Sequence, residues 1–473
     1  MEVPCRAVQA AENTTIHSFK KWSVRTSAVL ITAFGCGLVS TPSASVGPDD
    51  GIVAMSHQLS PDGAQQSPEK SRSDQVSTSG GVSTLYSELA DSTLPPIKNK
   101  SWGNAFHRAI TIVADKSADG YRFIENDTMG IPKQYFTAAE AGVNDPLVRQ
   151  AFAVKAVKKL IMSSVSLEGD GGGANDNGKF YPEDHLIVLN VSGKPKSRLF
   201  HTGLDITEVV DHEGIHGLTE RFLSSGNKDE QAVLSNCIQL NATTEAAYLL
   251  GPAANEISTM YDESAKAIEK ESRDFPSMDP TEKAARKATQ TALEQSAAMI
   301  NSGDEMAITA GLIKRAKCTS ANVSIYDLPA AILPAKYADL GVDEINITQE
   351  DTSLLDAALD DSFEQTYGCI TDSNAIIGDL TDNKYDSSAG HPRDDTRELS
   401  TSAIVSIHMN PTYVDRCIAA LSSGKPNQAR ILSRLIGAVI DGAENWYPGT
   451  AKAIVGNNGS VEKTITHLRQ LAA

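Results

Sequence analysis

Residues 208–222 read EVVDHEGIHGLTERF, and this stretch decides how the rest of the chain is interpreted. Two histidines, His212 and His216, stand four residues apart, and Glu213 directly follows the first. The apolar residues around them recur with the period of a helix, and Gly226 supplies a stop signal. Residues four apart on a helix share one face. The sequence therefore predicts a helix that presents both imidazoles to one point.

Two imidazoles on one helical face can bind a Zn²⁺ ion through nitrogens about 2.0–2.1 Å from the metal. Glu213 is poorly placed to be a ligand, but it can take a proton from a metal-bound water. Gly214 costs about 1 kcal/mol in a helix interior, which indicates that another element packs tightly against that turn. The alternative is a solvated helix face on which His212 and His216 coincide by chance.

In this setting the HEGIH pattern resembles the zincin superfamily of metallopeptidases. An apolar strand, DHLIVLN at 184–190, closely precedes the helix and matches the edge strand that lines the cleft of such enzymes. Metzincins need glycine and histidine where this chain has Thr219 and Phe222, so the resemblance implies the gluzincin class. It implies an α+β, predominantly helical fold, in which a zincin-like core with a small edge-stranded sheet packs on the HExxH helix and a helical C-terminal region follows.

The gluzincin class takes its third zinc ligand from a glutamate on a following helix. Glu245, in NATTEAAYLLG, fits this role, because a carboxylate among small helical residues is costly to bury without a metal or another partner. The predicted ligands are thus His212, His216 and Glu245. Other carboxylates stay open as the third ligand, namely Glu220, Asp229 and Glu230.

Further residues are candidates because of the same resemblance. Gluzincins use a tyrosine or histidine to stabilise the oxyanion, which implicates Tyr248 and His391 beside the catalytic Glu213. His391-Pro followed by Arg397 is similar to an element of the membrane-associated gluzincins related to the prenyl-protein protease, where it orders the active-site region or contacts substrate. Asp211 can orient a ligand as a hydrogen-bond acceptor.

The N-terminal region predicts export. A basic stretch, HSFKKWSVR, precedes an apolar run and small residues, which indicates a signal peptide at 1–45; a membrane anchor through 26–40 and a lipoprotein signal are alternatives. The Ser/Gly/Pro-rich residues 46–97 predict a disordered linker, which can also act as a pro-segment. Residues 98–255 then form the predicted catalytic core, and 256–473 a mainly helical region that completes the cleft.

Elsewhere the chain favours helix over strand. The segment 146–167 (PLVRQAFAVKAVKKLIMSSVSL) has helical periodicity, and the long helical region after 228 has a predicted break at Gly251-Pro252.

Four cysteines remain once the predicted signal peptide is removed. They are Cys237, Cys318, Cys369 and Cys417. In an exported chain they permit two disulfides, and four buried thiols are the alternative.

Composition limits the partners. The 473 residues carry a formal net charge of −18, which argues against a nucleic-acid partner. The sequence thus predicts a zinc-dependent hydrolase acting on a peptide or protein substrate. The alternative is a helical envelope or interaction protein whose zinc site is structural or vestigial.

Overall fold

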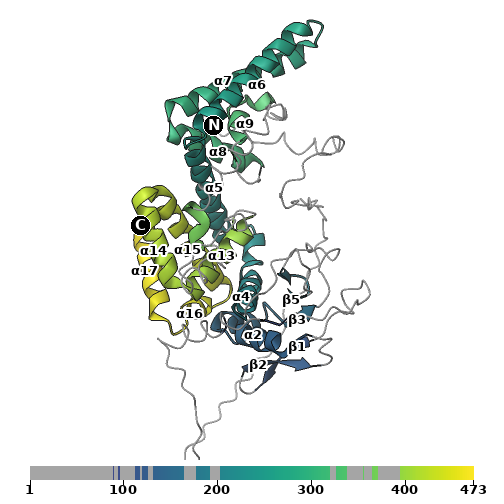
Figure 1. Ribbon diagram of the computed structural model, residues 1–473, viewed down its shortest axis with the longest axis vertical. Coiled ribbons are helices and arrows are strands. Elements are labelled where there is room, and N and C mark those ends of the chain that lie inside the picture. Colours follow the sequence, from purple (N-terminus) through teal and green to yellow (C-terminus); the bar gives the residue numbers. More distant parts are fainter. Residues whose placement is uncertain are drawn as a thin grey trace, which may run out of the picture. The chain divides into compact units, whose positions relative to one another are not determined.

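Helices dominate the part of the chain that the computed structural model describes, and they accompany a small sheet (Figure 1). The described residues are 89, 94–95, 112–117, 120–125, 131–163, 177–191, 203–319, 326–337, 355, 365–370, 392 and 395–473. The expected α+β, predominantly helical class is confirmed. The predicted signal peptide and most of the predicted linker lie outside the described residues, although Leu89 and Leu94 pack against the core. Among the helices described, none is both long and apolar enough to cross a bilayer.

The elements follow one another in chain order. The α-helices are α2 (Lys133–Val143), α3 (Pro146–Ala153), α4 (Gly203–Thr219), α5 (Lys228–Leu249), α6 (Ala254–Asp274), α7 (Pro280–Ser302), α8 (Glu305–Thr319), α9 (Asp327–Ile332), α13 (Thr396–Met409), α14 (Pro411–Gly424), α15 (Pro426–Trp446), α16 (Thr450–Val455) and α17 (Gly459–Ala472). Short 3₁₀ turns are η3 (Phe222–Ser224), η4 (Ala335–Tyr337) and η5 (Gly368–Ile370). The strands are β1 (Ile112–Ser117), β2 (Gly120–Glu125), β3 (Lys159–Ser163), β4 (Gly178–Tyr181) and β5 (Leu186–Asn190).

Helix α4, which carries the HExxH pattern, is buried along almost its whole length. It packs against α2, α3 and α13 and against strands β4 and β5. A Cβ atom at Gly214 would lie 3.1 Å from Cγ2 of Val148 on α3. The inference that another element packs against this turn is therefore confirmed, and the glycine allows the two helices to approach closely.

The three-stranded sheet has the order β3-β5-β4, with β3 parallel and β4 antiparallel to β5. The strand predicted within 184–190 exists as β5, but it is the central strand. The strand at the edge of the sheet beside α4 is β4, at 178–181. Its sequence, GKFY, is only four residues long and gave no strong strand signal. A separate hairpin consists of β1 and β2.

The single helix predicted over 146–167 is wrong in its second half. Helix α3 ends at Ala153, Lys155 has a positive φ of 62°, and β3 begins at Lys159. Residues 160–162 are buried and pair with β5, so sheet pairing outweighs the helical periodicity of this run. The break predicted at Gly251-Pro252 is confirmed, since α5 ends at Leu249 and α6 starts at Ala254.

One disulfide joins Cys369 of η5 to Cys417 of α14. Cys237 is a buried free thiol, and burial raises its pKa to about 12, so it stays protonated at neutral pH. The side chain of Cys318 lies outside the described residues. A second disulfide among these four cysteines would have to join Cys237 to Cys318. Because Cys237 is a free thiol, the predicted pair of disulfides does not form.

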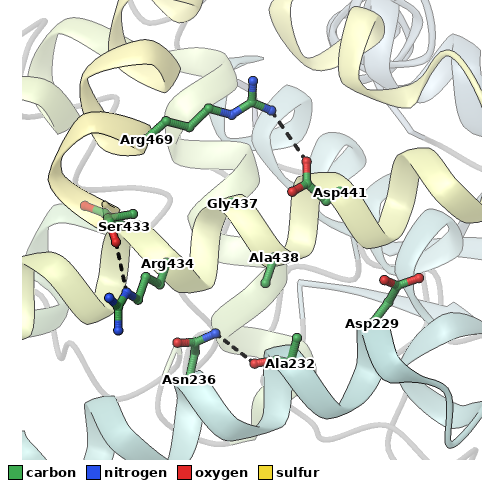
Figure 2. A pocket seen from close by; sticks show the side chains of 10 residues that line it. Asp229, Ala232, Asn236, Ser433, Arg434, Gly437, Ala438, Asp441 and Arg469 are labelled. Carbon is green, nitrogen blue, oxygen red and sulfur yellow. Dashed lines mark hydrogen bonds and ion pairs between the residues drawn. The ribbon is translucent and has the colours of Figure 1, made fainter.

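A shallow hollow of about 420 Å³ lies between α5, α15 and α17 (Figure 2). Small residues, Ala232 and Ala438 among them, line it, and charged side chains surround it. Those charges are already engaged within the protein: Arg469 pairs with Asp441 at 3.5 Å, and Arg434 donates to a backbone carbonyl of α17 at 3.0 Å. The hollow contains neither histidine of the HExxH pattern.

Candidate metal centre

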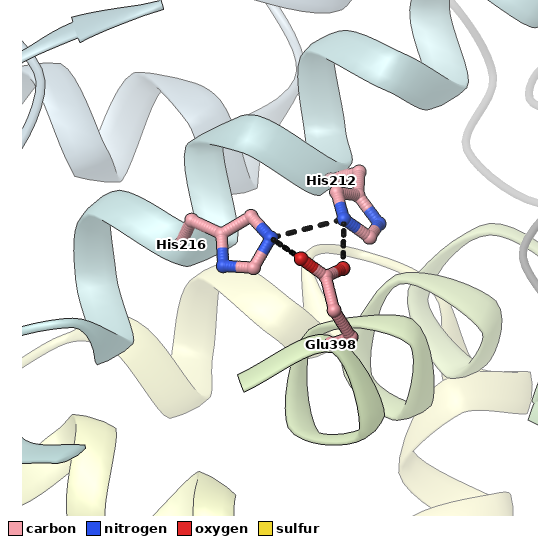
Figure 3. Close-up of side chains that lie close together, drawn as sticks. All are labelled: His212, His216 and Glu398. Atoms are coloured by element: carbon pink, nitrogen blue, oxygen red, sulfur yellow. Dashed lines mark hydrogen bonds and ion pairs between the residues drawn. The ribbon is translucent and has the colours of Figure 1, made fainter. Parts of the chain in front are cut away.

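Helix α4 brings the two histidines of the HExxH pattern together. The Nε2 atoms of His212 and His216 are 3.0 Å apart, and the rings meet edge to face with centroids 4.7 Å apart (Figure 3). Both residues are buried, with 7% and 9% of their surface exposed. This arrangement follows directly from the four-residue spacing on a helix.

A carboxylate from α13 completes the cluster. Glu398 places Oε2 3.0 Å from Nε2 of His212 and Oε1 3.4 Å from Nε2 of His216. The three ligand atoms all lie within 4.8 Å of one another, and they face a common point in Figure 3. The side chain of Glu398 is 21% exposed, so it forms the more open side of the cluster. It stands 186 residues after His212 in the chain.

The spacing of these atoms suits a zinc ion. Tetrahedral bonds of about 2.0–2.1 Å place neighbouring ligand atoms about 3.3 Å apart. The two Nε2 atoms are 3.0 Å apart, and each lies 3.0 to 3.4 Å from a different oxygen of the Glu398 carboxylate. Two imidazole nitrogens and a carboxylate also form a donor set that Zn²⁺ prefers. His212, His216 and Glu398 therefore could hold the metal.

The structure brings Glu398 to the two histidines, and the predicted third ligand, Glu245, lies outside this cluster. Glu245 is on α5 and is buried, with 1% of its surface exposed. It lies near Tyr261, whose pKa is raised first by burial and also by neighbouring charges that include Glu245. The physical reason is the helix packing: α13 packs against α4, whereas the packing of α5 is chiefly with α15 and α8.

The alternative third ligands have other contacts. Glu220 forms an ion pair with Arg397 at 3.2 Å. Asp229 accepts hydrogen bonds from Asn445, and Glu230 accepts one from a backbone amide. None of the three belongs to the ligand cluster.

No described residue that was a candidate for oxyanion stabilisation belongs to the cluster. Tyr248 is buried and donates its hydroxyl to the carbonyl of Leu355 at 3.2 Å. His391 lies outside the described residues. Arg397 directly precedes Glu398 of the cluster, and Asp211, which directly precedes His212, is fully buried.

Glu213 lies where helix α4 faces strand β4. It is buried, with 7% exposed. A Cβ atom at Gly178, the first residue of β4, would lie 3.1 Å from Oε1 of Glu213 and 2.5 Å from Cγ1 of Val209. Glycine at this position thus leaves the space that the Glu213 carboxylate occupies next to the edge strand.

The position of Glu398 is set by a helix cap. Asp395 accepts hydrogen bonds from the backbone N–H groups of Arg397, at 2.6 Å, and of Glu398 itself, at 2.9 Å. An aspartate cap of this kind stabilises a helix start by about 1 kcal/mol. The sequence DTRE therefore carried a usable signal, a capped helix that starts with an acidic residue.

The chain was compared with known protein families, with curated proteins and with solved structures, and no match was found in any of the three.

Proposed function

We propose that the protein is a zinc-dependent metallopeptidase in which His212, His216 and Glu398 hold the ion. The observation that carries the proposal is the meeting of Glu398 with the two imidazoles of an HExxH helix. A His₂Glu ligand set with an adjacent glutamate is the constellation of gluzincins. Glu398 lies much further along the chain than Glu245, the glutamate expected from that class, so the likeness is one of geometry and chemistry.

The chain's own residues support hydrolysis. When bound, Zn²⁺ supplies Lewis acidity, which polarises a carbonyl and lowers the pKa of water. Glu213 is next to the ligand His212 on the same helix, and its carboxylate takes a proton from the attacking water and returns it to the leaving amine. Its burial between α4 and β4 keeps the carboxylate fixed for this transfer.

The edge strand supports a peptide as the substrate. Within the described residues β4 pairs with β5 alone, and Gly178 of β4 is next to Glu213. An extended peptide can add to such an edge by main-chain hydrogen bonds. A peptide bound there would run past the general base.

The test separates metal binding from catalysis. Glu213→Gln should bind one zinc per chain, as the wild type does, and should lower kcat on unfolded casein by about 10²–10⁴-fold. An exposed glutamate on α7 provides the control, and Glu294→Gln should retain full activity. Equal activity of Glu213→Gln and the wild type would contradict the proposal.

The second candidate is a helical interaction protein with a structural zinc site. It is favoured by the burial of His212 and His216, because structural sites are closed to solvent. Zinc binding without any cleavage of casein, together with identical behaviour of wild type and Glu213→Gln, would support this candidate.

A further inference from the structure

The imidazole of His216 lies between two side chains of a single helix. On one side, Nε2 is 3.4 Å from Oε1 of Glu398. On the other side, Nδ1 is 3.3 Å from Oγ1 of Thr401. Glu398 and Thr401 are three residues apart on α13, a spacing that puts both on the same helical face.

The two nitrogens of a neutral imidazole have different roles. One carries a proton and donates, while the other has a lone pair that accepts a proton or binds a metal. For His216 to bind zinc through Nε2, Nδ1 must carry the proton and needs an acceptor. The hydroxyl of Thr401 has two lone pairs and is within hydrogen-bond distance.

Burial makes this partner important. Thr401 is fully buried and His216 is 9% exposed. A buried ring N–H without an acceptor would lose the hydrogen bond that water gives it in the unfolded chain. The bond to Thr401 thus favours the tautomer in which Nε2 faces the cluster.

We propose that Thr401 is a positioning residue, which accepts a hydrogen bond from Nδ1–H of His216 and keeps Nε2 available for zinc. This inference rests on the proposed metal site at His212, His216 and Glu398. Histidine ligands commonly donate to a carboxylate or a carbonyl. A hydroxyl instead adds no further negative charge beside the carboxylates of Glu398 and Glu213.

The test compares zinc affinity in full-length variants by competition with a chromophoric chelator. Thr401→Val keeps the shape of the side chain and removes the acceptor, so zinc should bind about 10–100-fold more weakly. Thr401→Ser restores the hydroxyl and should bind within a few-fold of the wild type. The matched control is Thr464→Val, at a buried threonine of α17 that donates to the carbonyl of Pro411, and its zinc affinity should be unchanged.

A second readout reports on the metal itself. The visible spectrum of the Co²⁺-loaded protein should change in Thr401→Val and stay as in the wild type in Thr464→Val. Wild-type zinc affinity in Thr401→Val, or an equal loss in Thr401→Ser, would overturn the positioning role and leave the proposed function intact. A wild-type protein that binds neither zinc nor cobalt would overturn the proposed function itself.

Discussion

Arg397 and Glu220 form an ion pair that ties the start of α13 to the end of α4, with 3.2 Å between Nη2 and Oε1. Arg397 directly precedes Glu398 of the cluster, and the backbone N–H of Glu220 donates to the carbonyl of His216 at 2.9 Å. Nη2 of Arg397 also reaches the hydroxyl of Ser224 at 3.4 Å. The two ligand-bearing helices are therefore joined twice, once at the cluster and once one turn beyond it.

Loss of this ion pair should have a small effect on zinc binding. The Arg397 side chain is 47% exposed, so the pair contributes at most about 1 kcal/mol. Arg397→Gln should thus weaken zinc affinity by up to about fivefold, and added salt should reduce the difference from the wild type. Titration with a zinc indicator measures the zinc affinity of each variant. Arg469→Gln breaks an exposed pair with Asp441 and should leave the affinity unchanged; an equal loss in both variants would contradict the specific role of Arg397.

The identity of the third ligand can be tested with two glutamates. Glu398→Gln removes the proposed anionic ligand and should lower zinc affinity by more than about 100-fold. Loss of a residue that only hydrogen-bonds to a metal ligand already lowers the affinity about 10–100-fold. Glu245→Gln should retain one zinc per chain, because Glu245 lies outside the cluster. Metal analysis after dialysis measures both. Zinc retained by Glu398→Gln and lost by Glu245→Gln would restore the original prediction.

Gly178 should matter for catalysis more than for zinc binding. In Gly178→Ala the new Cβ meets Val209 and the Glu213 carboxylate, so this carboxylate, the proposed general base, must shift. Misplacement by about 1 Å can lower kcat about 100-fold, while zinc affinity should stay at the wild-type value. Gly437→Ala, at a glycine of α15 with open space around it, is the matched control. Normal kcat in Gly178→Ala would show that Glu213 does not need this space.

His408 should make stability depend on pH. Burial alone would lower its pKa, but the charge of Asp145 and the hydrogen bonds to Asp145 and to the carbonyl of Ile454 raise the pKa above its ordinary value. The protonated ring therefore stabilises the fold below the unfolded-state pKa of about 6.5, and this stabilisation is lost as the pH rises through the folded-state pKa.

Chemical denaturation between about pH 5 and pH 9 measures the effect, a range that spans the titration of histidine. The difference in unfolding free energy between wild type and His408→Gln should be largest at the acidic end and should shrink as the pH rises. A difference that grows with pH would contradict the direction of the pKa shift.

The disulfide between Cys369 and Cys417 should contribute substantially to stability. It closes a loop with a sequence separation of 48, for which chain entropy predicts about 4 kcal/mol, and native disulfides typically contribute about 2–4 kcal/mol. The double variant Cys369→Ser with Cys417→Ser should therefore unfold at lower urea concentration. An unfolding free energy within about 0.5 kcal/mol of the wild type would be incompatible with this role.

Local patterns predicted the helical half of the site well. One helix contains all the features used: the spacing of His212 and His216, the apolar stripe and Gly214. The structure has this helix as α4, and Val148 packs against Gly214 as expected. The zinc ion, the peptidase activity and the zincin resemblance remain predictions.

The other half of the site depends on which helix packs against α4, which no local pattern encodes. Glu245 has a favourable sequence context, yet α5 takes it into a different part of the core. Glu398 directly follows Arg397, the last residue of the predicted element that begins at His391. The cap by Asp395 is a local feature of the chain, whereas the contact of Glu398 with His212 depends on how α13 packs against α4. Strand 184–190 was predicted at the sheet edge for a similar reason. The order of strands in a sheet depends on pairing between segments that are far apart in the sequence.

The 186 residues that separate His212 from Glu398 have a consequence for biosynthesis. On a ribosome the HExxH helix emerges long before α13, so the nascent chain carries the two imidazoles and Glu213 but lacks the Glu398 carboxylate that completes the cluster. The three side chains of the cluster can meet only after synthesis has passed Glu398. For the proposed hydrolase, this order of synthesis would keep the unfinished chain from being cut by its own site.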